Sequence, residues 1–202
     1  MKELASAVEG GETATAVRLL GQVGELYRYP ASPEEAEALL RAAGAATRAR
    51  DPAVQTAALR AVGRTGAAAG ASYVEPFLRS VNVEGGDQPV VLAAVEAAGR
   101  LSPPALVPPL LKLAQKSPNI TLAAESFVAL GRYRDAPVEL RKHVAGKVLE
   151  VCEYVSRRQA RWRRLRASGL RALQQLMGRK LNSVQMFTDW WRLAKTRKDP
   201  FQ

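Results

Sequence analysis

The chain has 202 residues and a formal net charge of +11; hydrophobic residues make up 47% of it and aromatic residues only 6%. This length can bury a core, and we predict a single domain over 1–202. One cysteine excludes an internal disulfide and a cysteine-rich metal site, and the sequence has no apolar run of the roughly 18 residues that span a membrane. The first residues lack the basic start and apolar core of a signal peptide, which predicts a cytoplasmic protein; the alternative is an exported, periplasmic protein whose leader has been removed.

Glycine and proline residues that interrupt helices divide the chain into predicted helices, which are grouped in pairs. Gly10 and Gly11 separate a short opening helix from one over about 12–24. The predicted pairs cover about 1–29, 33–67, 70–101, 103–134 and 136–178, and a final helix covers about 183–196. The stretch 81–88 is predicted to be a long loop. Because no segment alternates apolar and polar residues between turns, we predict an all-α chain.

Polar residues followed by proline mark the predicted helix starts. Ser32 precedes Pro33 and a run of glutamates. A hydroxyl cap, an early proline and acids near the positive end of the helix dipole all favour initiation there. Similar starts are expected at Asp51–Pro52, Ser102–Pro103 and Ser117–Pro118, with a weaker one at Gln88–Pro89.

A pattern of small and branched residues that ends on glycine recurs along the chain. The stripes are Val54, Ala58, Leu59, Val62 and Gly63; Val90, Ala94, Val95, Ala98 and Gly99; and Leu122, Ser126, Phe127, Leu130 and Gly131. These offsets place the residues on one face of a helix, which we predict to be buried. Gly21 and Gln174 align with the closing glycine in the first and fifth pairs. The recurrence predicts an α-solenoid of about five antiparallel helical hairpins with a C-terminal capping helix.

The middle of the chain also resembles a known family. The segment 103–135 carries Pro108, Leu110, Leu111, Leu113, Ser117–Pro118 and Ala129-Leu130-Gly131-Arg132. With these residues it resembles a bacterial HEAT repeat, and 51–64 and 88–100 resemble the second helix of such a repeat. Similar repeats occur in lyases that attach bilins, and the Trp-containing segment 187–192 is similar to tails that close some bacterial HEAT proteins. The resemblance covers about 34–178 and implies a stack whose second helices line a concave surface.

The positive charge is concentrated at one end of the sequence. Up to Gly131 there are 12 Lys and Arg against 13 Asp and Glu, and from Arg132 onward there are 18 against 6. The densest part holds seven arginines, which we predict to bind a partner: Arg157, Arg158, Arg161, Arg163, Arg164, Arg166 and Arg171. We expect these arginines to lie on the exposed face of a helix. Guanidinium groups make bidentate bonds to carboxylate or phosphate, so this face is a candidate anion-binding surface. The alternative is a solvated face whose arginines favour the helix and cover apolar surface.

These observations favour a binding protein over an enzyme. We predict a non-enzymatic scaffold that binds an acidic protein through a concave surface with a basic C-terminal end. The alternative is a nucleic-acid-binding protein similar to HEAT-like DNA glycosylases, although no aspartate matches their catalytic position; an anionic membrane surface is a further partner compatible with the charge. Trp162 falls on the core side of its helix, which disfavours stacking on single-stranded bases. We predict no cofactor and no metal site, with His143 on the surface and Cys152 buried.

Overall fold

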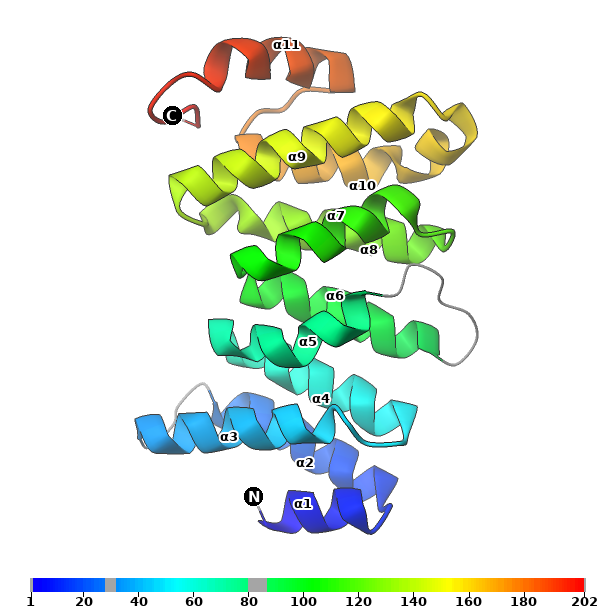
Figure 1. Cartoon of the computed structure of the whole chain (residues 1–202), viewed down its shortest axis with the longest axis vertical. Coiled ribbons are helices and arrows are strands. Elements are labelled where there is room, and N and C mark those ends of the chain that lie inside the picture. The colour runs from blue at the N-terminus through cyan, green and yellow to red at the C-terminus, as the bar shows by residue number, and fades with distance from the viewer. Residues whose placement is uncertain (1, 28–31, 80–86, 202) are drawn as a thin grey trace. The chain divides into compact units, whose positions relative to one another are not determined.

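The structure, a computed structural model, describes residues 2–27, 32–79 and 87–201 (Figure 1). These ranges contain eleven α-helices joined by turns and short 3-10 segments, and they contain no β-strand. The prediction of an all-α chain is therefore confirmed for the part of the chain that is described. Among those helices, none combines the length and the apolar character that a membrane crossing requires. The chain forms two compact units, residues 1–103 and 104–202.

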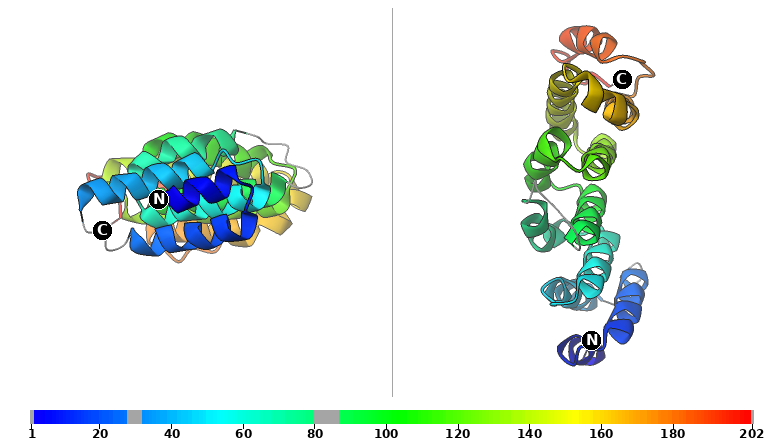
Figure 2. Two further views of the ribbon diagram at one scale, coloured as in Figure 1. Left: turned by 90° about the horizontal axis from the view of Figure 1, so that it is seen from below. Right: turned by 90° about the vertical axis from the view of Figure 1, so that its right-hand side faces the viewer.

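The described residues of the first unit form six α-helices in two rows. They are α1 (Lys2–Glu9), α2 (Thr13–Leu26), α3 (Pro33–Ala46), α4 (Pro52–Thr65), α5 (Ala71–Leu78) and α6 (Gln88–Leu101). Each helix packs against its successor in the pairs α1–α2, α3–α4 and α5–α6. The second members also pack in sequence, because α4 lies against both α2 and α6, and these helices form one of the two rows in Figure 2.

The second unit repeats this packing with longer helices. It contains α7 (Val107–Lys116), α8 (Ile120–Gly131), α9 (Val138–Ser156), α10 (Gln159–Met177) and α11 (Val184–Ala194). Helix α8 packs against α7 and α10, and α9 packs against α7, α10 and α11. Thus α7 and α9 form one row of this unit and α8 and α10 form the other (Figure 2), and α11 follows α9 at the end of the unit.

The periodic stripes read from the sequence are the buried seams between helices. Every member of the three stripes in α4, α6 and α8 is buried. The closing glycines allow close approach: a Cβ at Gly63 would lie 2.7 Å from Cα of Ala97 in α6. In α2 the equivalent close contact is made by Gly24, whose Cβ would lie 2.7 Å from Cδ of Arg64, whereas one at Gly21 would meet nothing within 4 Å. The alignment of Gly21 with the closing glycines is therefore wrong by one helical turn.

Two of the predicted helix starts have the expected caps. The hydroxyl of Ser32 accepts a hydrogen bond from the Glu35 amide at 3.2 Å, and Oδ1 of Asp51 accepts one from the Ala53 amide at 2.7 Å. The other carboxylate oxygen of Asp51 accepts a hydrogen bond from the hydroxyl of Thr13 at the start of α2. The Thr13 hydrogen bond and then the Ala53 amide lower the pKa of Asp51, because both stabilise the ionised carboxylate. This side chain therefore links the beginnings of two neighbouring second helices.

Two other predicted starts are wrong. Helix α8 begins at Ile120, and its cap is the side chain of Asn119, which accepts from two amides, whereas Ser117 is the C-cap of α7 and is fully buried. Ser102 does not open a helix; it ends α6 with φ 48° in the left-handed region, and its hydroxyl donates to the Gly99 carbonyl at 2.8 Å. The loop predicted over 81–88 lies mostly outside the described residues, and its last residue, Gln88, is the first residue of α6.

Candidate functional site

The arginine-rich segment is divided between the end of one helix and the next. Helix α9 ends at Ser156, Arg157 is its C-cap, and Arg158 precedes α10 with φ −102° and ψ 80°. The arginines at 157 and 158 therefore lie in the connection between the two helices, before the first turn of α10. The far end of α10 is closed by Gly178 with φ 65°, a left-handed conformation that glycine adopts without a steric penalty.

The apolar side of α10 packs as its sequence predicts. Its buried residues are Leu165, Gly169, Ala172, Leu173, Leu176 and Met177. A Cβ at Gly169 would lie 3.1 Å from both Sγ of Cys152 and the ring of Trp162. Trp162 is thus half-buried against α9, on the core side as expected. Cys152 is fully buried, and burial raises the pKa of its thiol.

Six of the seven predicted arginines are exposed, and only Arg161 is half-buried. Arg164 and Arg171 project from the same side of α10, seven residues apart, which separates their Cα atoms by about 10 Å along the axis. This side turns toward α8, since Gln175 on the same flank lies against Gly131. Neither Arg164 nor Arg171 has a hydrogen bond or ion pair with any residue in the described part of the chain. Both guanidinium groups are available to a ligand.

Arg161 is part of the packing between helices. Its Nη2 donates to the carbonyl of Ala114 in the last turn of α7 at 3.4 Å, and its Nε is buried without a hydrogen-bond partner within the described ranges. Burial and then the neighbouring charge of Arg158 lower the pKa of Arg161. Arg161 therefore contributes to the packing of α10 against α7, and its guanidinium is less accessible to a partner than the sequence predicts.

The remaining arginines have different surroundings. Arg158 lies over the Tyr154 ring at 4.1 Å, a cation–π contact at the start of α10. Arg166 donates to the Asn182 carbonyl at 3.4 Å, in the connection between α10 and α11. Arg163 is on the same flank as Arg166, and like Arg157 it is exposed. The predicted cluster is thus two cationic flanks, one toward α8 and one toward α11.

The sequence around α10 carries charges of one sign over a long stretch. Residues 154–188 hold nine Lys and Arg and no Asp or Glu. Residues 1–153 hold 17 of each sign, so the entire net charge of +11 belongs to residues 154–202. A localised positive potential of this kind attracts anionic partners and accelerates their association.

The C-terminal segment packs more closely than a frayed end. Helix α11 buries Phe187 and Ala194, and the Trp191 ring lies beside Gly146 of α9, 3.5 Å from the position of a Cβ there. Beyond the helix, the Phe201 ring stacks on Trp191 with centroids 6.2 Å apart, and Arg141 lies 3.8 Å over Phe201. The Phe201 side chain is therefore held against α9 and α11 by these contacts. Sequence reasoning missed Arg141 because its partners lie far away in the chain.

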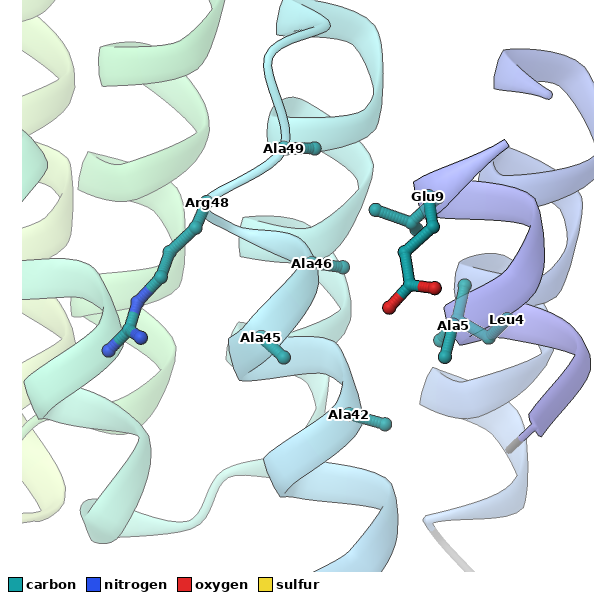
Figure 3. Close-up of a pocket in the computed structure, with 9 residues that line it drawn as sticks. Leu4, Ala5, Glu9, Ala42, Ala45, Ala46, Arg48 and Ala49 are labelled. Carbon is teal, nitrogen blue, oxygen red and sulfur yellow. The ribbon is translucent and has the colours of Figure 1, made fainter. Parts of the chain in front are cut away.

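The other candidate residues do not form a chemical site. His143 is exposed, as predicted, and the described residues contain no group of three or more His, Cys, Asp or Glu that could hold a metal ion. A pocket of about 280 Å³ lies between α1 and α3 in the first unit (Figure 3). Its walls are mainly alanine; the Glu9 carboxylate points into the gap and the Arg48 side chain points away from it. Such a lining offers apolar contact and a single charge.

The strongest candidate site is therefore the exposed cationic surface of α10. We name the pair Arg164 and Arg171 the α8-side flank, and the pair Arg163 and Arg166 the α11-side flank. Comparison of the chain with protein-family models, with curated proteins and with solved structures gave no match.

Proposed function

We propose that the protein is a non-enzymatic scaffold that binds an acidic protein segment through the α8-side flank of α10. The observation that carries this proposal is the presence of two exposed guanidinium groups, Arg164 and Arg171, without intramolecular partners in the described chain. They lie within a stretch of nine cations and no carboxylate. An exposed cationic surface of this kind attracts an anionic partner.

The proposed architecture is a HEAT-like α-solenoid. Support comes from the two-row packing within each unit and from the buried stripes that end on glycine. In such a stack each repeat contacts its neighbours, and one row of helices lines an extended concave surface. Within the second unit, α8 and α10 would belong to that row, with the α8-side flank on its C-terminal member.

An acidic protein segment fits the α8-side flank better than a single-stranded nucleic acid does. Arg164 and Arg171 are two helical turns apart, so carboxylates at the same spacing on a partner helix would face both of them. Base stacking would require an accessible aromatic ring beside Arg164 and Arg171, and Trp162, the aromatic residue nearest to them in the sequence, is instead packed against Gly169 and Cys152. Duplex DNA can bind through its phosphate backbone without base stacking, so it is the alternative partner that the experiment must test.

The test compares two probes and two double variants. A fluorescent peptide helix with glutamate at every seventh position and a fluorescent DNA duplex are titrated with the full-length protein at low and at physiological salt. We expect the wild type to bind the peptide and the variant Arg164→Glu/Arg171→Glu to lose at least tenfold in affinity, since each charge-assisted hydrogen bond contributes roughly 1.5–3 kcal/mol. The control Arg48→Glu/Arg50→Glu makes the same charge change at two exposed arginines of the first unit and is expected to bind normally.

Two results would reject the proposal. One is unchanged peptide binding by Arg164→Glu/Arg171→Glu while its circular dichroism matches that of the wild type. The other is tighter binding of the duplex than of the peptide at physiological salt, which would assign the surface to nucleic acid. Affinity capture from the native host with wild type and variant side by side would then identify the partner.

A further inference from the structure

Helix α11 exposes an apolar stripe that its packing does not use. Met186 is 48% exposed and Leu193 is 74% exposed, and Trp190 between them is half-buried. Their spacing of four and three residues places all three on one side of the helix. Leu193 is the most exposed large hydrophobic residue in the described part of the chain.

A different side of α11 holds the helix in place. Phe187 and Ala194 are buried against the unit, and the hydroxyl of Thr188 donates to Glu153 of α9 at 2.6 Å. Figure 1 shows α11 at the end of the second unit, beyond α9 and α10. The stripe is therefore presented by a fixed helix and is available for an outside surface.

Cations lie beside this stripe. The guanidinium of Arg179 is 5.6 Å from the centroid of the Trp190 ring, and Lys180 next to it is exposed. Arg166 on the α11-side flank donates to Asn182, one residue before the N-cap of α11. The only acid on α11, Asp189, is paired with Arg192 at 3.6 Å. An apolar stripe containing tryptophan is thus combined with a strongly cationic surrounding.

We propose that α11 docks this stripe onto the surface of an anionic lipid bilayer. Trp, Met and Leu can enter the boundary between headgroups and acyl chains, while nearby Lys and Arg attract the anionic headgroups. Neither contribution is large for three side chains, so binding requires both and depends on lipid charge. This interaction is separate from the α8-side flank and does not rest on the proposed acidic-protein partner.

Charge favours a lipid surface over a second copy of the chain. Two copies that meet through this stripe would bring together two C-terminal segments of net charge +11 each. A bilayer that contains anionic lipid instead presents negative charge over a wide plane, where scattered cations such as Arg163, Arg166 and Lys180 can all be neutralised.

The experiment is co-sedimentation of the full-length protein with vesicles, accompanied by tryptophan emission spectra. One set of vesicles is phosphatidylcholine alone, and the other is equal parts of phosphatidylcholine and phosphatidylglycerol. We expect binding and a blue shift of emission only with the anionic vesicles. Met186→Ser/Leu193→Ser should weaken that binding by about tenfold, since two apolar side chains no longer enter the boundary. Leu26→Ser, at a leucine that is 56% exposed on α2, is the matched control and should leave binding unchanged.

Three results would overturn the proposal. The first is equal binding to neutral and anionic vesicles. The second is undiminished binding by Met186→Ser/Leu193→Ser. The third is absence of binding to the anionic vesicles. If the wild type is then a dimer in sedimentation velocity that this variant dissociates, the stripe is a contact between copies. The variant Met186→Ser/Leu193→Ser leaves the α8-side flank intact, so it should still bind the acidic peptide. A titration of this variant with the peptide therefore tests the proposed function independently of the lipid proposal.

Discussion

Two glycines of the first unit, Gly63 and Gly21, lie inside helices but have different surroundings. Gly63 of α4 faces the backbone of α6 at Ala97, and a Cβ would approach it to 2.7 Å. Gly21 of α2 has open space where a Cβ would lie. The first is a packing requirement, because helix backbone cannot yield as a flexible side chain can. The second has no such role and costs helix stability.

We expect Gly63→Ala to destabilise the protein by about 1–3 kcal/mol, because α4 and α6 must separate to admit the methyl group. Gly21→Ala, the matched change, should stabilise it by about 0.5–1 kcal/mol through reduced backbone entropy in the unfolded chain. Denaturant unfolding followed by circular dichroism measures both free energies. Equal effects of the two substitutions would mean that the α4–α6 contact is not as close as described.

At the scale of the helices, local sequence predicts several boundaries correctly, and the start of α8 is one that it places wrongly. Ser117 and Asn119 are both residue types that cap helices, and Pro118 lies between them. Sequence alone favours Ser117 because the proline then occupies the first helical position. In the structure Ser117 is fully buried at the end of α7 and its hydroxyl accepts no hydrogen bond from the described α8 amides, whereas Asn119 accepts two. Packing of α7 therefore overrides the local signal.

This assignment predicts opposite results for two neighbouring substitutions. Asn119→Ala should cost about 0.5–2 kcal/mol, because the amides of Thr121 and Leu122 lose their acceptor. Ser117→Ala should be neutral or stabilising, since the Ser117 hydroxyl is buried without a hydrogen-bond partner within the described ranges. Thermal unfolding of the two variants distinguishes the caps; a larger loss for Ser117→Ala would restore the original prediction.

The arginine-rich helix illustrates what helical periodicity leaves open. The pattern correctly separates the buried side, represented by Leu165 and Leu173, from the charged side. It does not reveal that Arg161 reaches Ala114, 47 residues earlier, or that Arg166 holds the chain that leads into α11. Contacts of this kind depend on which helix lies alongside, and a single-helix projection has no information about that neighbour.

At the scale of the whole molecule, residues 154–188 contain nine Lys and Arg and no Asp or Glu. Repulsion among cations three and four residues apart opposes folding, and dissolved salt screens it. The net charge and its position could be predicted from the sequence. The pairing of Phe201 with Arg141 and Trp191 could not, because it depends on where the last residues return to the helices.

The melting temperature should accordingly rise with sodium chloride between low and physiological concentration. Arg164→Gln/Arg171→Gln should raise the low-salt melting temperature by about 1–2 °C, because it removes a few tenths of a kcal/mol of charge repulsion. The melting temperature of this variant should also rise less with added salt than that of the wild type. Differential scanning calorimetry at several salt concentrations measures both effects. A melting temperature that falls as salt is added would show instead that attractive ion pairs dominate.

The three tryptophans of the chain, at positions 162, 190 and 191, all belong to the second unit. Selective excitation of indole therefore gives an optical signal from that unit alone, whereas far-ultraviolet ellipticity sums the helices of both. Recording the two signals during one denaturant titration compares the cooperativity of the two halves without any added label. The wild-type sequence thus carries its own site-specific reporter of the half that contains α10 and α11.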